Sequence, residues 1–320
     1  MPQPFHGNSL NQLSIGKAKT FVDQIDNLTE NAPIVGSMPF KPSTDQLWDV
    51  ASEVKLLKSV GRVDMNAPLP DIQIADALQQ TQLNIFGAEI FVPEDLALLE
   101  QGPDKYFNKN RAAFDRQTGM DVETNYIYNA FLPFALAMNK AGNKNAQNAG
   151  GSANQNYSLI VARFDDVNMA GLYSPLAFSG KTFLDMKPIN GGALYKQSDP
   201  NHKFFNVLGY GLRMKTYLGV RMLSHRNIGA IVNIDPTTAT PLTRKMVEKA
   251  LLSARTGEAG KAMIMCHPQI GLLLQDIGKV QQLSTEYTQK AADFRLESWN
   301  GVPLVTSYNF MDGTETNISV

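Results

Sequence analysis

The sequence predicts an α+β fold, and three observations lead to this prediction. Short β-type segments follow one another in the second half of the chain, separated by Gly, Pro, Asn and Asp residues. Their lengths and separators favour antiparallel strands over parallel crossovers. Two amphipathic segments, one beginning at Pro103 and one at Thr240, have the pattern of helices. A sheet-rich body with such helices belongs to the α+β class.

The chain begins with a predicted helix and an extended connector. Apolar residues recur at helical spacing over residues 10–28 and define one face: Leu10, Leu13, Phe21, Ile25 and Leu28. Pro33, Pro39 and Pro42 follow, and they argue against a helix interior or a central strand. This region has no obvious place to bury its apolar side chains within the chain, so we expect it to bury them against neighbouring molecules.

A hairpin with a long tip is predicted next. From Trp48 to Leu56, apolar residues alternate with Asp49, Glu53 and Lys55, which predicts a strand with one side in water. Its expected partner is a second alternating run over residues 72–79. The chain between the two runs is broken by Gly61, Pro68 and Pro70. A tip of this length favours a flap that reaches away from the body, and an ordinary edge hairpin of a large α/β domain is the alternative.

A long helix is predicted from Pro103 to about residue 131. Gly119 weakens its middle by roughly 1 kcal/mol relative to Ala, so we expect a bend there. Residues 140–156 are polar and offer almost nothing to bury. We interpret them as a loop that joins two structural halves.

The remaining predicted elements are short. We expect strands over residues 158–164, 170–173, 204–210, 212–218, 228–234, 262–266, 302–308 and 314–320. A helix capped by Thr240 and Pro241 is predicted to run to about Arg255, with Gly257 beyond it. A shorter helix is predicted over residues 268–278.

Composition argues against several classes of function. The 320 residues are 43% apolar, which is enough for a real core, and the formal net charge of −1 gives no general attraction to phosphate backbones or anionic membranes. The single Cys266 excludes an internal disulfide, and its apolar neighbours predict a buried thiol in a reducing cytoplasm. No segment has the pattern of a signal peptide or a membrane helix, so we expect neither export nor a membrane partner.

No constellation of residues predicts catalysis or metal binding. Cys266 and His267 are adjacent, and adjacent residues of a strand point to opposite faces, so they are poorly placed to hold one ion. Gly209 and Gly211 begin like a dinucleotide loop, but the third glycine and the helix start are missing. The sequence has no phosphate-binding loop and no nucleophile elbow. We therefore predict no enzyme activity, with no catalytic residue, no cofactor and no metal.

The most basic region of the chain surrounds Arg221. It comprises Lys203, Arg213, Lys215, Arg221, His225 and Arg226. A solvated sheet face or a contact between subunits explains this region as well as a nucleic-acid patch does.

Several segments, taken in order, resemble one known family. They are residues 28–35, 157–164, 171–175, 219–235, 299–305 and 314–316. Together with the order of predicted elements, they make nearly the whole chain similar to the major capsid proteins of tailed bacteriophages, short-tailed phages above all. That fold is shared with encapsulin shells and with the floor domain of herpesvirus capsids. The asparagine-rich stretch over residues 143–156 departs from the family pattern.

The resemblance implies a domain organisation. Residues 1–45 would form an N-terminal arm, residues 46–92 an extended hairpin loop, residues 93–150 with 306–320 a peripheral domain around a long spine helix, and residues 151–305 an axial domain. Deleting residues 1–40 would then leave a folded body that does not close into shells.

The resemblance also implies a function and its partners. The chain would be a structural protein that self-assembles through hexamers and pentamers into the icosahedral head shell around double-stranded DNA. Its implied partners are copies of itself, the portal, scaffolding or decoration proteins and, through non-specific contact, the packaged DNA. The implied location is the virion, after assembly in the bacterial cytoplasm.

Two other functions stay open. One is an encapsulin-like compartment shell, which needs an inner cargo groove and an enzyme partner. The other is a soluble α+β enzyme or binding protein with an N-terminal extension. Some members of the wider fold also link a lysine to an asparagine. Lys55 or Lys58 with Asn309 or Asn317 are available here, although composition makes such pairs common.

Overall fold

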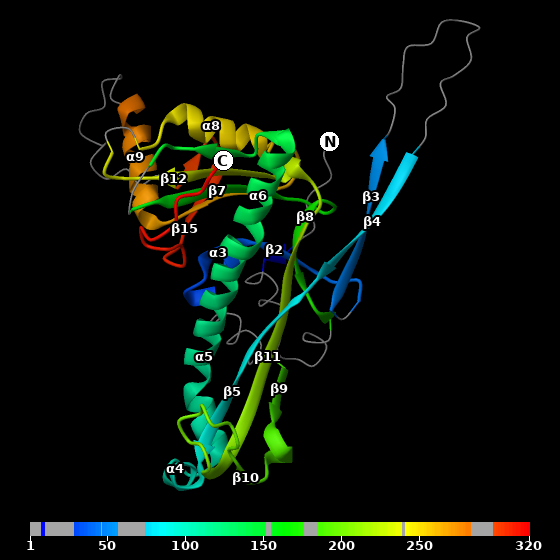
Figure 1. The fold of residues 1–320 in the computed structure, drawn as a ribbon, viewed down its shortest axis with the longest axis vertical. Helices are drawn as coiled ribbons and strands as arrows, with labels where there is room; N and C mark the ends of the chain where they lie inside the picture. Colours follow the sequence, from blue (N-terminus) through cyan, green and yellow to red (C-terminus); the bar gives the residue numbers. More distant parts are fainter. Residues whose placement is uncertain are drawn as a thin grey trace, which may run out of the picture.

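The computed structural model describes residues 8–9, 29–45, 47–56, 74–151, 155–175, 185–238, 241–282 and 297–320. The predicted helix over residues 10–28 and the tip of the predicted hairpin lie outside these residues. The described chain forms two sheets, a long interrupted helix that runs along both, and a separate two-stranded hairpin (Figure 1). The predicted α+β class is confirmed.

A six-stranded mixed sheet forms one end of the molecule (Figure 1). In spatial order its strands are β14 (Ser298–Trp299), β15 (Val302–Thr306), β13 (Lys261–Cys266), β7 (Tyr157–Phe164), β12 (Ile228–Ile234) and β6 (Ala146–Asn148). Every residue of β7 and β12 is buried, because both faces of the sheet are covered. Helices α8 (Arg244–Ser253) and α9 (Pro268–Gln282) pack on one face, and the long helix packs on the other.

The seven-stranded sheet is organised around one strand, β11 (Leu208–Met222). Its partners are β5 (Asn84–Pro93), β8 (Met169–Tyr173), β9 (Asp185–Pro188) and β10 (Tyr195–Lys196), and β2 (Pro39–Pro42) and β1 (Asn8–Ser9) extend it beyond β8. The sequence predicts two strands where the structure has β11 alone. Residues 204–206 form a turn, and pairing with β5 keeps the chain straight through Gly209 and Gly211.

These two glycines serve close packing, in agreement with the prediction that the chain continues there as a strand. A Cβ atom at Gly209 would lie 2.2 Å from the carbonyl oxygen of Val92, and one at Gly211 would lie 2.4 Å from the hydroxyl of Tyr195. Both contacts are too short for any larger residue.

The long helix is confirmed, but its irregularity is elsewhere than predicted. Helix α5 (Pro103–Asn125) runs without interruption through Gly119, so the predicted bend there is wrong. A π-helical stretch follows at η1 (Tyr126–Phe131), and α6 (Leu132–Met138) and η2 (Asn139–Asn143) carry the helix past its predicted end. The π-helical stretch directly precedes Pro133, which has no N–H for regular helical pairing.

The proline-rich connector is more ordered than predicted. Pro33 begins the short helix α3 (Pro33–Ser37), where a missing N–H costs nothing, and Phe40 and Lys41 pair with β8 between the two other prolines. Ile34, Val35, Met38 and Phe40 are buried in the largest core cluster. The part of the predicted arm around α3 and β2 is therefore built into the body.

Smaller differences have local causes. The cap of α8 is Thr243, not Thr240, because the Thr243 side chain accepts a hydrogen bond from the Met246 amide. Strand β6 lies within the predicted loop 140–156 and pairs in parallel with β12. The predicted strand over residues 314–320 is wrong, because this segment makes only isolated bridges with Asn156.

The two sheets do not follow the predicted domain limits. Strands β8 and β11 lie in the predicted axial range 151–305 but belong to the seven-stranded sheet. Helix α6 and strand β6 lie in the predicted peripheral range 93–150 but pack on or pair with β12. The chain crosses between the sheets several times, and the predicted domain limits stay a prediction.

Candidate assembly surfaces

The hairpin of β3 (Trp48–Leu56) and β4 (Ile74–Gln82) stands apart from the two larger sheets. The two strands are antiparallel, in register from Trp48 opposite Gln82 to Leu56 opposite Ile74, and neither joins the other sheets. Figure 1 shows the hairpin projecting away from the body. The predicted strand pair is thus confirmed.

The face that the hairpin turns to solvent is the apolar one. Trp48 is 42% exposed and Val50 is 38% exposed, and their cross-strand neighbours Gln82 and Gln80 are exposed as well. Asp49, on the opposite face, is only 1% exposed. The sequence predicts that Asp49 lies on the side of the strand that faces water. In the structure Asp49 faces the body, because it pairs with Arg221. In the single chain, Trp48 and Val50 at the hairpin base therefore stay partly exposed.

A second apolar surface lies at the far end of the seven-stranded sheet. Helix α4 (Glu94–Leu99) presents Leu98 and Leu99 to solvent, the latter 80% exposed. Phe205, in the turn before β11, and Leu208, the first residue of β11, are exposed at the same end of the molecule. In Figure 1, α4 and β10 mark this end, opposite the six-stranded sheet. Exposed apolar side chains that gather at one end of a molecule are candidates for a protein contact.

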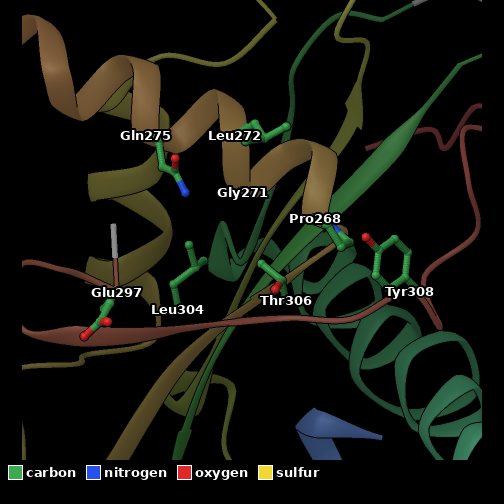
Figure 2. Close-up of a pocket in the computed structure, with 8 residues that line it drawn as sticks. All are labelled: Pro268, Gly271, Leu272, Gln275, Glu297, Leu304, Thr306 and Tyr308. Atoms are coloured by element: carbon green, nitrogen blue, oxygen red, sulfur yellow. The ribbon is translucent and has the colours of Figure 1, made fainter. Parts of the chain in front are cut away.

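A pocket of about 540 Å³ lies between α9 and β15. Figure 2 shows Leu304 and Thr306 pointing from β15 toward α9, with Tyr308 at one side. Among the described residues that line it, Glu297 is the only carboxylate, and none is a histidine, cysteine, lysine or arginine. The lining suits a contact with another surface better than it suits acid–base chemistry.

Glu123 joins three distant segments in the interior. Its Oε2 accepts hydrogen bonds from the amides of Ile34 and Val35, at 2.8 and 3.1 Å. Its Oε1 accepts hydrogen bonds from the hydroxyl of Ser307 and from Asn309 Nδ2, the latter at 2.9 Å. Burial raises the pKa of Glu123, and these hydrogen bonds oppose the rise. The carboxylate thus ties the connector and the C-terminal segment to the long helix.

The C-terminal segment is held by a second set of polar contacts. Glu315 accepts hydrogen bonds from the hydroxyls of Tyr128 and Ser158, at 2.6 and 2.5 Å. The side-chain amide of Asn233 binds both main-chain groups of Ile318, accepting from its N–H at 2.9 Å and donating to its carbonyl at 2.7 Å. Hydrogen bonds, not strand pairing, therefore fix the end of the chain.

The residues that sequence analysis examined for chemistry do not converge on a site. Cys266 is buried, and burial raises the pKa of its thiol to about 12, so it is no nucleophile. Arg221, in the predicted basic region, is ion-paired with Asp49. Asn309, considered for a covalent link, donates to the Asn31 carbonyl and to Glu123. Within the described ranges no group of three His, Cys, Asp or Glu side chains could hold a metal ion.

Among the helices in the described part of the chain, none is both long enough and apolar enough to cross a bilayer.

Two sheets, a long helix along both and a projecting hairpin define the fold that the resemblance implied, that of the major capsid proteins of tailed phages. The solved structure that carries this conclusion is the cryo-EM structure of bacteriophage Epsilon15. A chain in it matches with a TM-score of 0.56 at 13% identity, over 87% of this chain and 88% of that one. No protein-family model matches the sequence, and no curated protein does.

Two further structures match less well. The holo-SrpI encapsulin complex from Synechococcus elongatus PCC 7942 has a TM-score of 0.43 at 11% identity, over 65% of this chain and 89% of that one. The bacteriophage JBD30 capsid has a TM-score of 0.38 at 10% identity, over 71% of this chain and 76% of that one.

Proposed function

We propose that this chain is a phage major capsid protein, a structural shell subunit and not an enzyme. The observation that carries the proposal is the fold shared with bacteriophage Epsilon15 over most of both chains. The projecting hairpin supports it, because its base exposes Trp48 and Val50, a surface that another subunit could cover. Copies of the chain would form hexamers and pentamers in an icosahedral head that encloses double-stranded DNA.

Many weak contacts per subunit would hold such a shell together. The hairpin, the apolar end at α4 and the pocket beside α9 lie on different parts of the molecule. A subunit with several separate contact surfaces can bind several neighbours at once, and closure then stabilises all contacts together. The formal net charge of −1 agrees with a shell that encloses DNA without binding it tightly.

We assign the parts of the fold to roles on the same basis. The six-stranded sheet with α8 and α9 would surround the symmetry axes, and the seven-stranded sheet with α5 would form the periphery. The portal, scaffolding or decoration proteins and the packaged DNA would be the other partners, in a virion assembled in the bacterial cytoplasm. An encapsulin-like shell is the second candidate, because the resemblance seen in the sequence extends to encapsulin shells.

The first test is the size of particles formed by the purified full-length chain. Sedimentation and negative-stain microscopy, with and without co-expressed neighbouring phage genes, should show closed shells or isolated pentamers and hexamers. Nuclease-protected DNA inside particles from phage-producing cells would favour the virion, and a protein cargo would favour the encapsulin-like shell. A stable monomer or dimer under every condition would contradict both and restore the soluble enzyme or binding protein.

A further inference from the structure

A basic surface lies where the end of the long helix meets α8. It comes from the end of η2, from the short helix η4 (His225–Asn227) and from α8. Five exposed cationic side chains form it, and we call them the basic ridge: Lys140, Lys144, Arg226, Lys245 and Lys249. We propose that the basic ridge binds the phosphate backbone of duplex DNA without reading its sequence, a role that rests on the proposed shell function.

Hydrogen bonds hold the three parts of the ridge together. The Ser253 hydroxyl lies 3.3 Å from the Lys144 carbonyl oxygen and 2.9 Å from that of Lys249, so it joins the end of η2 to α8. The Asn145 side-chain amide, next to Lys144, donates to the His225 carbonyl at 2.5 Å. Figure 1 shows the end of the long helix and α8 at the same end of the molecule. The ridge is therefore one surface built from segments that are far apart in sequence.

The charges of the ridge are not offset by acids of the chain. Within the described ranges none of the five cations has an ion-pair partner. Glu248, the single acid of α8, pairs with Arg244 at 2.5 Å. Glu258, which follows that helix, pairs with Arg255 at 3.0 Å. Both nearby acids thus already have cationic partners outside the ridge.

The ridge is unfavourable for the chain by itself. Lys245 and Lys249 are four residues apart on one helix, where like charges repel each other. Folding then brings Lys144 to the same place through Ser253. The whole chain has a formal net charge of only −1, so this concentration of positive charge is local. A polyanion would offset the repulsion and release its own counterions.

The side chains of the ridge suit phosphate groups better than bases. Residues 139–145, 224–227 and 244–253 contain no aromatic side chain on which a base could stack. Leu252 is 76% exposed and shares a helix face with Lys245 and Lys249, which would suit an acidic, partly apolar peptide. Five charges beside one apolar side chain favour the DNA backbone over such a peptide.

The test measures how the unassembled full-length chain binds a fluorescent DNA duplex. The anisotropy of a duplex of about 20 base pairs is followed at several salt concentrations, and the logarithm of the association constant should fall with that of salt with a slope of about −4 to −5. Two duplexes of unrelated sequence should bind equally. Lys144→Gln with Lys249→Gln should weaken binding at least about tenfold at low salt and reduce the size of the slope by about 2.

The matched control removes the same charge at the opposite end of the molecule. Lys196→Gln with Lys203→Gln changes two exposed residues at or near β10 (Figure 1). This control should keep the affinity and the slope of the unmodified chain. Leu252→Ser should keep both as well, because phosphate groups make no use of an apolar side chain. Thermal unfolding of each variant verifies that the fold is unchanged.

Equal losses of affinity in the two double variants would overturn the proposal, because binding would then follow overall charge. Binding that does not depend on salt would overturn it too. Capture of an acidic amphipathic peptide without binding of the duplex, with loss of capture in Leu252→Ser, would assign the ridge to a protein partner instead. These measurements need no assembly, so a chain that never forms shells would contradict the proposed function and leave the DNA-binding result intact.

Discussion

Glu123 and Asp115 are two buried acids on the long helix, and they differ in how many hydrogen-bond partners their carboxylates have. Glu123 receives hydrogen bonds from both ends of the fold, whereas neither carboxylate oxygen of Asp115 has a hydrogen-bond partner among the described residues. The nearest charge to Asp115 is Arg111, whose Nε lies 3.8 Å from Oδ2. Burial raises the pKa of Asp115 from 3.8 to about 7, and Arg111 opposes the rise.

Replacing Asp115 by Asn should therefore remove a pH-dependent loss of stability. The folded state holds the proton up to about pH 7, whereas the unfolded chain releases it near 3.8, so folding becomes less favourable as pH rises between these values. We expect Asp115→Asn to raise the free energy of unfolding at about pH 8 by about 2–4 kcal/mol, and to have little effect below the ordinary pKa. Urea unfolding of the unassembled chain across this pH range checks the prediction.

Asp121→Asn is the matched control, because Asp121 is an exposed acid on the same helix. It should leave the pH dependence unchanged. If Asp115→Asn destabilises the chain equally at every pH, ionisation of Asp115 does not govern stability and the prediction is wrong.

At the scale of the element, the hairpin combines a polar side toward the body with an apolar side toward solvent. Asp49 and Thr81 are cross-strand neighbours on the inner face, and Trp48 and Val50 lie on the outer face. A lone protein would reverse this arrangement, because exposed apolar area is unfavourable by roughly 25 cal/mol per Å². The arrangement is favourable when the outer face is covered by a second molecule.

The double variant Trp48→Ser with Val50→Ser should weaken assembly more than folding. The outer face contributes little to the free chain, so the midpoint of thermal unfolding should change little, while the concentration needed for shells or capsomers should rise at least about tenfold, which corresponds to about 1.4 kcal/mol per subunit. Light scattering and sedimentation measure this concentration. Gln80→Ser, on the same face opposite Val50, is the control and should assemble normally. A lower midpoint of thermal unfolding in the double variant, together with normal assembly, would contradict this prediction. The hairpin would then be an ordinary packed hairpin.

At the scale of the whole molecule, the N-terminal connector belongs to the core. Ile34, Val35, Met38 and Phe40 pack in the cluster that also contains Val122 and Phe131 of the long helix. Each such buried side chain contributes about 1.5–3 kcal/mol, and a domain is stable by only about 5–15 kcal/mol. The expectation that deletion of residues 1–40 leaves a folded body is therefore revised.

Two truncations separate the connector from the segment before it. We expect deletion of residues 1–28 to leave a chain with cooperative thermal unfolding that forms fewer shells, and deletion of residues 1–40 to abolish cooperative unfolding. Circular dichroism and electron microscopy measure the two properties. Normal shells from the shorter deletion would contradict an assembly role for residues 1–28, and a cooperatively folded chain from the longer one would contradict the core role of α3 and β2.

Much of the fold can be predicted from local patterns. The strand over residues 228–234 is present with the same limits, because a run of apolar and small residues between turn residues has few other solutions. The long helix from Pro103 and the pairing of the hairpin strands follow in the same way from helical and period-2 patterns. The order of elements then sufficed to suggest the capsid fold, which the Epsilon15 match supports at 13% identity.

The candidate site could be predicted only in part. The sequence locates the hairpin but assigns Asp49 to water, because Arg221 is distant in the chain and becomes a partner only through folding. The burial of the connector and the role of Glu123 depend on contacts between residues that are far apart in sequence.

The sequence by itself determined the class of fold, the long helix, the pairing of the hairpin strands and the strand over residues 228–234, because these depend on local spacing and residue type. The tertiary structure decided which face of the hairpin meets solvent, which sheet each strand joins, and which charges are paired. Those properties depend on long-range contacts, whose energies are set by the three-dimensional arrangement of the chain.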